Sequence, residues 1–325
     1  MELSTQEKTI LGGDIGGTKT LLGTQAGTNR LELVQHYENR THEEFSAVLE
    51  DYLNRYPALQ PNDCILTLAI AGPVSQQRCQ MTNLPWLIDA AALKRHFGFH
   101  AVYLLNDLAA TAWALPDQFE QDALHMLHGN SLDFSQPVAV ISIGTGMGEA
   151  VLAPSSLGGF QVLATEGGHK QFAPFDLRSA RLLEQAFATG LPAVSWENWF
   201  SGTGLPQLFS ALYPDLEVPA NETLAVLART QPQSPAGQCI ALLADGIFAE
   251  AGNLALQSLA WGGVVFAGGV VQHIQHLIKD ARHQRWFSSK AEYTDRLEQI
   301  PLALCTDSQV ALKGAIAYSG YRQMN

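Results

Sequence analysis

Short apolar runs and apolar residues at helical spacing alternate along the first third of the chain. The short runs predict strands, whereas apolar positions three and four residues apart predict helices over 42–55 and 90–97. Gly98 follows the second helix as a C-terminal cap. The predicted strands cover residues 8–15, 20–24, 31–36, 64–71 and 101–105. Three strands followed by alternating helices and strands indicate a mixed α/β fold.

The pattern restarts near Ser135 and then becomes richer in helices. Runs at 137–143, 149–153 and 160–164 again predict three strands, with a glycine turn between the first two. A long helix is predicted to begin at Ser234-Pro235, because Ser suits the N-cap and Pro the first helical position, and to end at Gly262-Gly263. Two halves that each begin with strand, glycine turn and strand suggest a duplicated fold with a cleft between the halves. The remaining predicted elements are helices over 179–189, 204–212, 220–230 and 308–321, and strands over 264–267 and 299–305.

The first glycine turn, Gly12-Gly13-Asp14-Ile15-Gly16-Gly17-Thr18, joins two predicted strands. Its glycines let backbone N–H groups approach a ligand closely, which suits a phosphate. Asp14 would repel a bare phosphate but suits one that carries Mg²⁺. A Walker A loop is excluded, because Thr18 stands where its Lys belongs and a strand rather than a helix follows. The turn therefore predicts a metal–nucleotide site.

The second glycine turn, Gly144-Thr145-Gly146-Met147-Gly148, has the appearance of a dinucleotide-binding fingerprint. Glu149 stands in place of the third glycine, and a strand-like run follows where the fingerprint needs a helix. The dinucleotide motif is therefore absent.

Length and composition set the class of the protein. At 325 residues the chain can form two domains with their own cores, which we place at 1–108 plus 308–325 and at 109–307. Hydrophobic residues make up 46% and charged residues 15%, as in compact soluble proteins. A net charge of −12 without a basic stripe argues against nucleic acid as a partner.

The cysteines and the N-terminal segment bear on the cell compartment. Cys64 and Cys305 lie in apolar runs, and no Cys-x-x-Cys pair is present, so we expect reduced core residues. The N-terminal residues have no apolar signal core, and we expect no apolar run to be long enough to span a membrane. We therefore expect a cytoplasmic protein with no membrane partner.

Asn106 and Asp107 follow an apolar predicted strand at its carboxyl end, where ligands bind in α/β sheets. Asn106 can donate to and accept from hydroxyls, and Asp107 can accept a proton from one. Alternatively, Asp107 caps the helix that begins at Leu108. The two roles of Asp107 are compatible.

Two later segments carry further candidate residues. Glu166 and His169 stand three apart across two glycines and could face one cavity, or they belong to an ordinary surface loop. A zinc site is rejected there, because no second His or Cys stands at ligand spacing. Glu197 lies among aromatic residues and is either a ligand or an exposed helix carboxylate. The glycines at 202 and 204 would let an adenine or ribose lie against the start of the next helix.

Taken together, these motifs resemble the bacterial glucokinases in order and spacing, from about residue 10 to residue 320. Each glycine motif alone is weak, but the ordered set is specific. The resemblance implies the two-lobed, actin-like ATPase (ribonuclease H-like) α/β fold, with a cleft that closes on a sugar. The motifs are Gly13–Thr18, Ala71-Gly72-Pro73-Val74, Met81-Thr82-Asn83, Asn106-Asp107, Gly144-Thr145-Gly146, Glu166-Gly167-Gly168-His169, Ser201-Gly202-Thr203-Gly204 and Ala267-Gly268-Gly269-Val270.

The resemblance also implies an activity and the residues behind it. The activity is transfer of the γ-phosphate of ATP to the 6-hydroxyl of D-glucose, with Asp107 as the catalytic base and Mg²⁺ held by Asp14 through water. It further implies a cytoplasmic homodimer. The sugar ligands would be Asn106, Asp107, Glu166, His169 and Glu197. The ATP ligands would be Gly13, Asp14, Ile15, Gly16, Gly17, Thr18, Gly144, Thr145 and Gly146 at the phosphates and Gly268 and Gly269 at the adenosine.

Two alternatives share part of this pattern. A kinase of another hexose would carry every motif quoted. A non-catalytic sugar sensor or actin-like nucleotide-binding protein would need the glycine turns but not Asp107 with the complete sugar set. Lys19 stands where close relatives often carry Asn, and the sequence assigns it no role.

Overall fold

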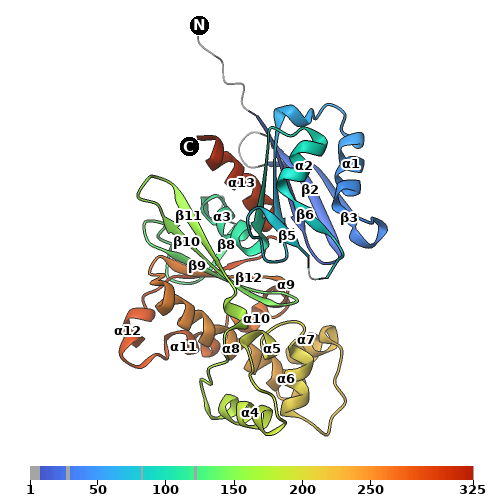
Figure 1. Ribbon diagram of the computed structural model, residues 1–325. Coiled ribbons are helices and arrows are strands. Elements are labelled where there is room, and N and C mark those ends of the chain that lie inside the picture. Colours follow the sequence, from blue (N-terminus) through green and yellow to red (C-terminus); the bar gives the residue numbers. More distant parts are fainter. Residues whose placement is uncertain (1–7, 27–29, 82, 121–122, 325) are drawn as a thin grey trace. The chain divides into compact units, whose positions relative to one another are not determined.

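The computed structural model describes residues 8–26, 30–81, 83–120 and 123–324 (Figure 1). The N-terminal segment considered for a signal sequence and Thr82 of the predicted motifs lie outside the described residues. The chain divides into two compact units, residues 1–121 with 307–325 and residues 122–306. The first unit thus includes the whole helix that begins at Asp107, whereas the sequence analysis placed the boundary at residue 108.

The first unit contains a five-stranded sheet in the order β3-β2-β1-β4-β7. β2 is antiparallel to β1 and to β3, whereas β4 is parallel to both β1 and β7. Its strands are β1 (Thr9–Ile15), β2 (Lys19–Ala26), β3 (Arg30–Glu38), β4 (Cys64–Ile70) and β7 (Ala101–Asn106), with β5 (Arg78–Gln80) and β6 (Leu87–Asp89) as a separate pair. Its helices are α1 (Phe45–Arg55), α2 (Ala90–Phe97), α3 (Asp107–Glu120) and α13 (Val310–Met324), with short 3₁₀ turns η1 (Asn39–Thr41) and η2 (Pro61–Asp63).

Strand β4 lies at the centre of this sheet and is buried on both faces. Leu66 and Leu68 face one core, where they pack with residues of α1 and α2. Ala69 faces the other side, where it packs with Ala110 of α3 and Ala315 of α13. A strand covered by helices on both faces reads as a continuous apolar run, which is why residues 64–71 were predicted as a strand.

The second unit contains a six-stranded sheet in the order β11-β10-β9-β12-β13-β8. Its strands are β8 (Leu124–His128), β9 (Val138–Ile143), β10 (Met147–Pro154), β11 (Phe160–Thr165), β12 (Gly263–Ala267) and β13 (Leu302–Cys305). The helices are α4 (Leu177–Ala188), α5 (Trp196–Trp199), α6 (Leu205–Leu212), α7 (Asn221–Thr230), α8 (Pro235–Ser258), α9 (Gly269–His273), α10 (Gln275–Ile278), α11 (Ala281–Ser288) and α12 (Thr294–Leu297), with 3₁₀ turns η3 (Gly167–His169) and η4 (Ala291–Tyr293).

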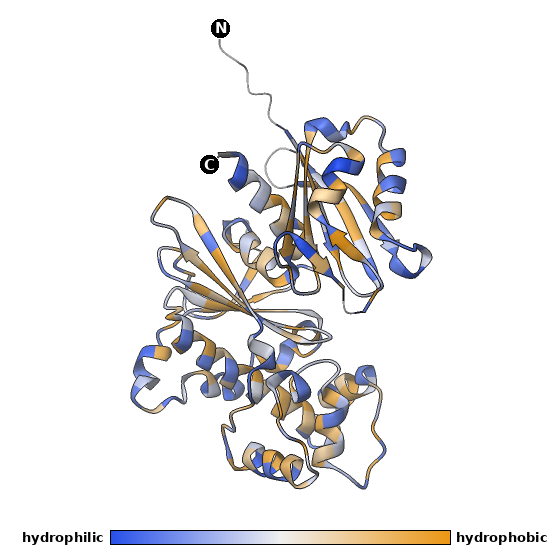
Figure 2. Cartoon of the chain, viewed as in Figure 1, coloured by the Kyte–Doolittle hydropathy of each residue, from blue (hydrophilic) through white to orange (hydrophobic). Residues whose placement is uncertain are grey.

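The two sheets repeat one topology. In both, an antiparallel trio is followed by two further strands that run parallel to the first strand of the trio. The predicted duplication is therefore confirmed. β8 pairs antiparallel with β13 at one edge of the second sheet and was missed, because its Leu-His-Met-Leu-His sequence carries only a weak apolar pattern. Figure 2 shows the strands of both sheets mainly in the hydrophobic colour.

Helix α8 corrects one expectation. Within the described part of the chain, it is the one helix long and apolar enough to cross a membrane. The expectation that no apolar run is long enough to span a membrane is therefore wrong. Of its apolar window, 83% is buried inside the protein, as in a core helix. Its start is as predicted, with Ser234 Oγ accepting the Gly237 N–H at 3.2 Å. Its end is not, because the left-handed C-cap is Leu259 rather than a glycine.

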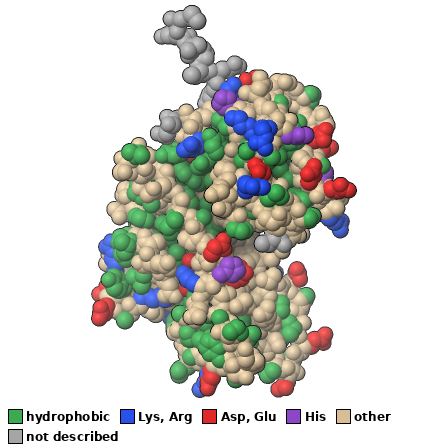
Figure 3. All heavy atoms as spheres, in the orientation of Figure 1, with side chains coloured by type: hydrophobic (Ala, Val, Ile, Leu, Met, Phe, Trp, Pro, Cys, Tyr) green, Lys and Arg blue, Asp and Glu red, His purple; other side chains and the backbone are tan. Residues whose placement is uncertain are grey.

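Other local signals are confirmed. Gly98 adopts the left-handed conformation after α2, and its N–H donates to the Lys94 carbonyl. Cys64 and Cys305 are buried free thiols. On the face shown in Figure 3, Lys and Arg side chains lie in small separate groups.

Candidate active site

The junction of β7 and α3 holds Asn106 and Asp107. Asn106 Oδ1 accepts the N–H groups of Leu108 at 3.0 Å and Ala109 at 3.2 Å. Asn106 is therefore the residue whose side chain caps α3, a role that the sequence analysis had considered for Asp107. Asp107 is the first helical residue, and its Oδ1 accepts the Leu108 N–H at 2.9 Å. Its carboxylate is thereby fixed at the carboxyl end of the sheet.

The first glycine turn is held by Asn39, a buried residue that the sequence analysis missed. Asn39 Nδ2 donates to the Gly16 carbonyl at 2.8 Å, and its backbone N–H donates to the Thr18 carbonyl at 2.9 Å. Thr20 Oγ1 in turn donates to Asn39 Oδ1 at 2.7 Å. Two carbonyls of the turn therefore face Asn39, and the turn is shaped before any ligand arrives. No local motif marks Asn39, because it is brought to the turn by the pairing of β2 with β3.

Asp14 is half-buried near the end of β1. Burial, and secondly the negative charge of Asp107, raise the pKa of Asp14 to about 7. Lys19 does not compensate it, because its Nζ lies 3.7 Å from Glu38 Oε1 in an exposed ion pair. Among the described residues no Lys, Arg or His pairs with Asp14. A partly buried carboxylate that lies near a second carboxylate and pairs with no basic side chain of the described residues suits a hard cation, which prefers oxygen ligands.

We expect Asp14→Asn to stabilise the protein in the absence of metal. The pKa of Asp14 is raised in the fold, so the folded protein binds more protons than the unfolded chain between pH 4 and 7, and stability falls as pH rises through this window. Removing the carboxylate should raise the free energy of unfolding by about 1–2 kcal/mol near pH 8, after allowance for a half-buried side chain. The gain should be smaller near pH 5.5.

Urea unfolding of both proteins, near pH 8 and near pH 5.5 with a chelator present, measures the difference in the free energy of unfolding. Equal or lower stability of Asp14→Asn near pH 8 would contradict the prediction.

The second glycine turn, between β9 and β10, is fixed by the segment before α6. The N–H of Gly202 donates to the Gly144 carbonyl at 2.8 Å. The N–H and Oγ1 of Thr203 both donate to the Thr145 carbonyl at 3.0 Å. Gly144 N–H closes the turn on the Gly146 carbonyl at 2.9 Å. The Ser201–Gly204 motif therefore supports this turn.

Glu166, His169 and Glu197 form one cluster, which we call the carboxylate–histidine cluster. His169 Nε2 lies 3.9 Å from Glu166 Oε2, and His169 Nδ1 lies 3.8 Å from Glu197 Oε1. Glu197 Oε2 accepts the Met147 N–H at 2.8 Å, so this carboxylate also contacts the second glycine turn. With a side chain 27% exposed, Glu197 is not an exposed helix carboxylate. The cluster presents acceptors and a ring nitrogen, which suit hydroxyl groups.

Aromatic packing positions Glu197. Helix α5 has four residues, too few to be stable alone. Ser195 and Asn198 form a reciprocal capping box at its start. The rings of Trp196 and Phe200 pack on Phe172, with centroids 4.6 and 5.3 Å apart. The buried rings thus hold a very short helix in place.

A cavity of about 330 Å³ is lined by residues of α6, α7, α8 and α9, among them Val270, the residue after Gly269. Asn221 Nδ2 donates to the Gly202 carbonyl at 2.7 Å, which links this cavity to the support of the second glycine turn. Asn221 Oδ1 is buried and has no hydrogen-bond partner among the described residues. The cavity has the size and mixed lining of a small-molecule pocket. It is lined by Leu205, Asn221, Glu222, Ala225, Val226, Arg229, Ile240, Val270, His273 and Ile274.

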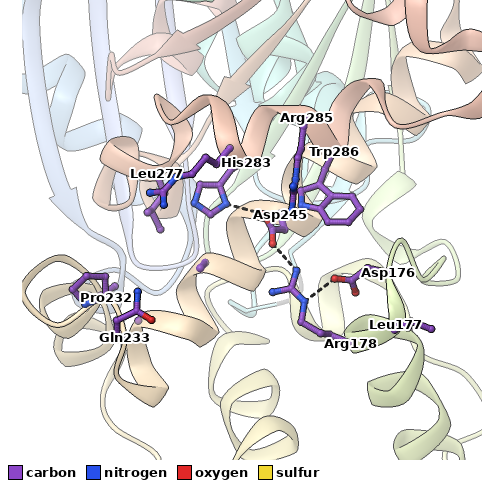
Figure 4. A pocket seen from close by; sticks show the side chains of 14 residues that line it. Asp176, Leu177, Arg178, Pro232, Gln233, Asp245, Leu277, His283, Arg285 and Trp286 are labelled. Carbon is purple, nitrogen blue, oxygen red and sulfur yellow. Dashed lines mark hydrogen bonds and ion pairs between the residues drawn. The ribbon is translucent and has the colours of Figure 1, made fainter.

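A larger cavity of about 600 Å³ in the same unit contains none of the predicted site residues (Figure 4). Its buried Asp245 accepts from Arg178 Nη2 at 2.7 Å and lies 2.7 Å from His283 Nδ1. Arg178 Nε also donates to Asp176 at 2.6 Å. The ion pairs and hydrogen bonds of this network join α4, α8 and α11. We assign the network a structural role.

Comparison with known proteins decides the family. The family model named Glucokinase matches residues 11–321. The chain belongs to the glucokinase family. A glucokinase of Colwellia psychrerythraea is 34% identical over 316 residues, which cover 94% of each chain. A solved glucokinase from an Antarctic psychrotroph has a TM-score of 0.86 and 27% identity, covering 97% of this chain and 100% of that one. Balamuthia mandrillaris glucokinase, solved with glucose, has a TM-score of 0.78 and 22% identity, covering 97% and 94%.

Membership in the glucokinase family confirms two predictions. The fold is the α/β fold of the actin-like ATPases, and the chain is an ATP-dependent sugar kinase, a phosphotransferase. The roles of individual residues stay predictions. Among the predicted ligands, the structure brings Glu166, His169 and Glu197 together in the second unit, and Asp14 near enough to Asp107 in the first for their charges to interact.

Proposed function

We propose that this glucokinase-family chain transfers the γ-phosphate of ATP to the 6-hydroxyl of D-glucose, giving glucose 6-phosphate and ADP. The observation that carries this is the carboxylate–histidine cluster, in which Glu197 contacts both His169 and the second glycine turn. Polar side chains that suit hydroxyl groups, hydrogen-bonded to a glycine turn that suits phosphate, fit a reaction between a sugar and a nucleotide. The family names of the relatives support glucose as the sugar.

In this proposal Asp107 acts on the 6-hydroxyl. Its carboxylate takes the proton as the hydroxyl oxygen bonds to the γ-phosphorus and the bond from phosphorus to ADP breaks. Asn106 and the carboxylate–histidine cluster orient the sugar through its other hydroxyls. Orientation matters most, because phosphoryl transfer depends mainly on positioning and electrostatics.

ATP is proposed to bind with its phosphates at the two glycine turns and its adenosine beside Gly268 and Gly269. The cavity at α9 supports the adenosine site, because it is lined by apolar residues together with the polar side chain of Asn221. Asp14 fits Mg²⁺ as a carboxylate without a basic partner among the described residues, and it would hold the ion through water. Mg²⁺, when bound, neutralises charge on the phosphates. From the family likeness we also propose a cytoplasmic homodimer.

An assay of ADP release, coupled to a second enzyme and run against a panel of hexoses, tests the proposal. We expect the highest kcat/KM with glucose and ATP, and much lower values with ADP or polyphosphate as donor. A preference for fructose, mannose or an N-acetylated hexosamine would make the chain a kinase of that sugar. Hexose binding without ADP release would favour a sensor.

We expect Glu166→Gln and Glu197→Gln to raise the KM for glucose, because a neutral amide accepts more weakly from a hydroxyl than a carboxylate does. Loss of a charge-assisted hydrogen bond worth about 1.5–3 kcal/mol corresponds to a roughly tenfold or larger rise. Glu217→Gln, on an exposed loop, is the control and should keep wild-type values. An unchanged glucose KM in both cluster variants would remove these residues from the sugar site.

A further inference from the structure

A buried ionic network lies against the turn that carries Glu166 and His169. Lys170 Nζ lies 3.0 Å from Glu149 Oε2 on β10 and 2.5 Å from Glu250 Oε1 on α8. The two carboxylates are 2% and 0% exposed. Neither the sequence motifs nor the proposed reaction uses these three residues.

The backbone of Lys170 joins the two segments that form the carboxylate–histidine cluster. Lys170 directly follows His169, and its N–H donates to the Gly167 carbonyl at 3.1 Å, which closes η3. Its own carbonyl accepts the N–H of Trp196, the residue before Glu197, at 3.2 Å. A shift of Lys170 would therefore move both sides of the cluster.

The turn also rests directly on Glu149. A Cβ at Gly167 would overlap the Glu149 carboxylate. Thr165 Oγ1 donates to the Glu149 carbonyl at 3.0 Å and accepts the Gly167 N–H at 3.1 Å. Because no space separates the turn from this side chain, the position of the carboxylate determines the position of the turn.

Stability alone does not account for this network. Burying two carboxylates costs desolvation free energy, and the attraction to a single lysine offsets only part of that cost. A buried ion pair often stabilises a protein no more than well-packed apolar side chains of similar volume do. A second lysine lies near, with Lys290 Nζ donating to Asn253 Oδ1 at 2.6 Å while Asn253 Nδ2 donates to Glu250 at 2.8 Å. Even so, Glu149 Oε1 is buried without a hydrogen-bond partner among the described residues. What the network does supply is a fixed location for Lys170.

We propose that Lys170 is a positioning residue for the sugar. Its ammonium group, held between Glu149 and Glu250, sets the location of Glu166 and His169 relative to Glu197 and thereby the affinity for the hexose. This inference rests on the sugar site given under the proposed function.

The first test is Lys170→Met, assayed for hexose KM, ATP KM and melting temperature. We expect the hexose KM to rise about tenfold or more, because misplaced side chains lose hydrogen bonds to the hexose hydroxyls, while the ATP KM changes less than about twofold. Lys170→Arg retains the cation and should restore most of the hexose affinity. A folded Lys170→Met with wild-type hexose KM overturns the proposal.

Lys170→Met leaves two buried carboxylates without their lysine, and it is expected to be less stable. The triple variant Glu149→Gln, Lys170→Met, Glu250→Gln removes all three charges and should recover a near wild-type melting temperature. If Lys170 positions the turn, the hexose KM stays raised in the triple variant although stability returns. If the network only stabilises the fold, KM and melting temperature return together, which overturns the proposal.

Arg178→Met is the matched control. It breaks the ion pair with the buried Asp245 of the same unit (Figure 4), and should lower the melting temperature while keeping the hexose KM. A raised hexose KM in this control would show that any loss of stability acts on the site, and would also overturn the proposal.

An assay of the wild-type protein, made first, distinguishes a failure of the proposed function from a failure of the positioning role. If it phosphorylates a hexose other than glucose, the KM of that hexose is used. If it releases no ADP with any hexose, the proposed function fails, and the positioning role is decided by the hexose Kd of the same variants in calorimetry.

Discussion

Asp107→Asn is expected to lower kcat by about three powers of ten or more while leaving the hexose Kd close to wild type. A general base contributes roughly 10²–10⁴-fold to the rate of the chemical step, and the neutral amide of asparagine cannot take the proton of the hydroxyl. The fold should tolerate the change, because the asparagine oxygen can still accept the Leu108 N–H and because Asn106 caps α3. Steady-state kinetics with ADP detection give kcat, and calorimetry gives the Kd.

Asp117→Asn is the control for this prediction. It makes the same chemical change on the same helix, ten residues away, and should leave kcat unchanged. Near-normal turnover in Asp107→Asn would remove Asp107 as the base. Loss of hexose binding together with turnover would instead make it chiefly a sugar ligand.

The elements that the sequence predicted well are those with a strong local signal. Helix α2 was predicted with its observed bounds, because its apolar spacing ends at a glycine that can adopt the left-handed conformation. The start of α8 followed from Ser234-Pro235. By contrast, α9, α10 and α12, which were not predicted, have five residues or fewer. Elements so short carry too few apolar positions to show a period.

At the candidate site, too, the sequence predicts only what a local signal marks. Its motif residues could be named from the sequence, since glycines and acids at fixed spacing mark them. The residues that hold them could not, because the contacts cross the chain. Asn39 reaches Gly16 over 23 positions, and Lys170 reaches Glu250 over 80. Apolar periodicity reports which face of an element is buried, but not which distant polar residue meets a turn.

Gly268→Ala is expected to destabilise the protein by about 3 kcal/mol or more, whereas Gly269→Ala should leave its stability near wild type. Gly268 has φ 96° and ψ 158°, a conformation open essentially to glycine alone, with a strain of about 1–3 kcal/mol for other residues. A Cβ there would also lie 2.6 Å from the Ile143 carbonyl carbon, which adds an overlap cost of about 1–3 kcal/mol. Thermal unfolding should show a melting temperature lower by roughly 5–10 °C.

Gly269 is the matched control for stability and a separate test of the adenosine site. It is the first residue of α9, and a Cβ there would have nothing within 4 Å. In Gly269→Ala that open space is occupied by a methyl group, so the ATP KM should rise while the glucose KM and the melting temperature stay near wild type. An unchanged ATP KM would remove Gly269 from the ATP site, and a wild-type melting temperature in Gly268→Ala would contradict the backbone conformation of this turn. The two adjacent glycines thus separate a requirement of the fold from a requirement of the ligand.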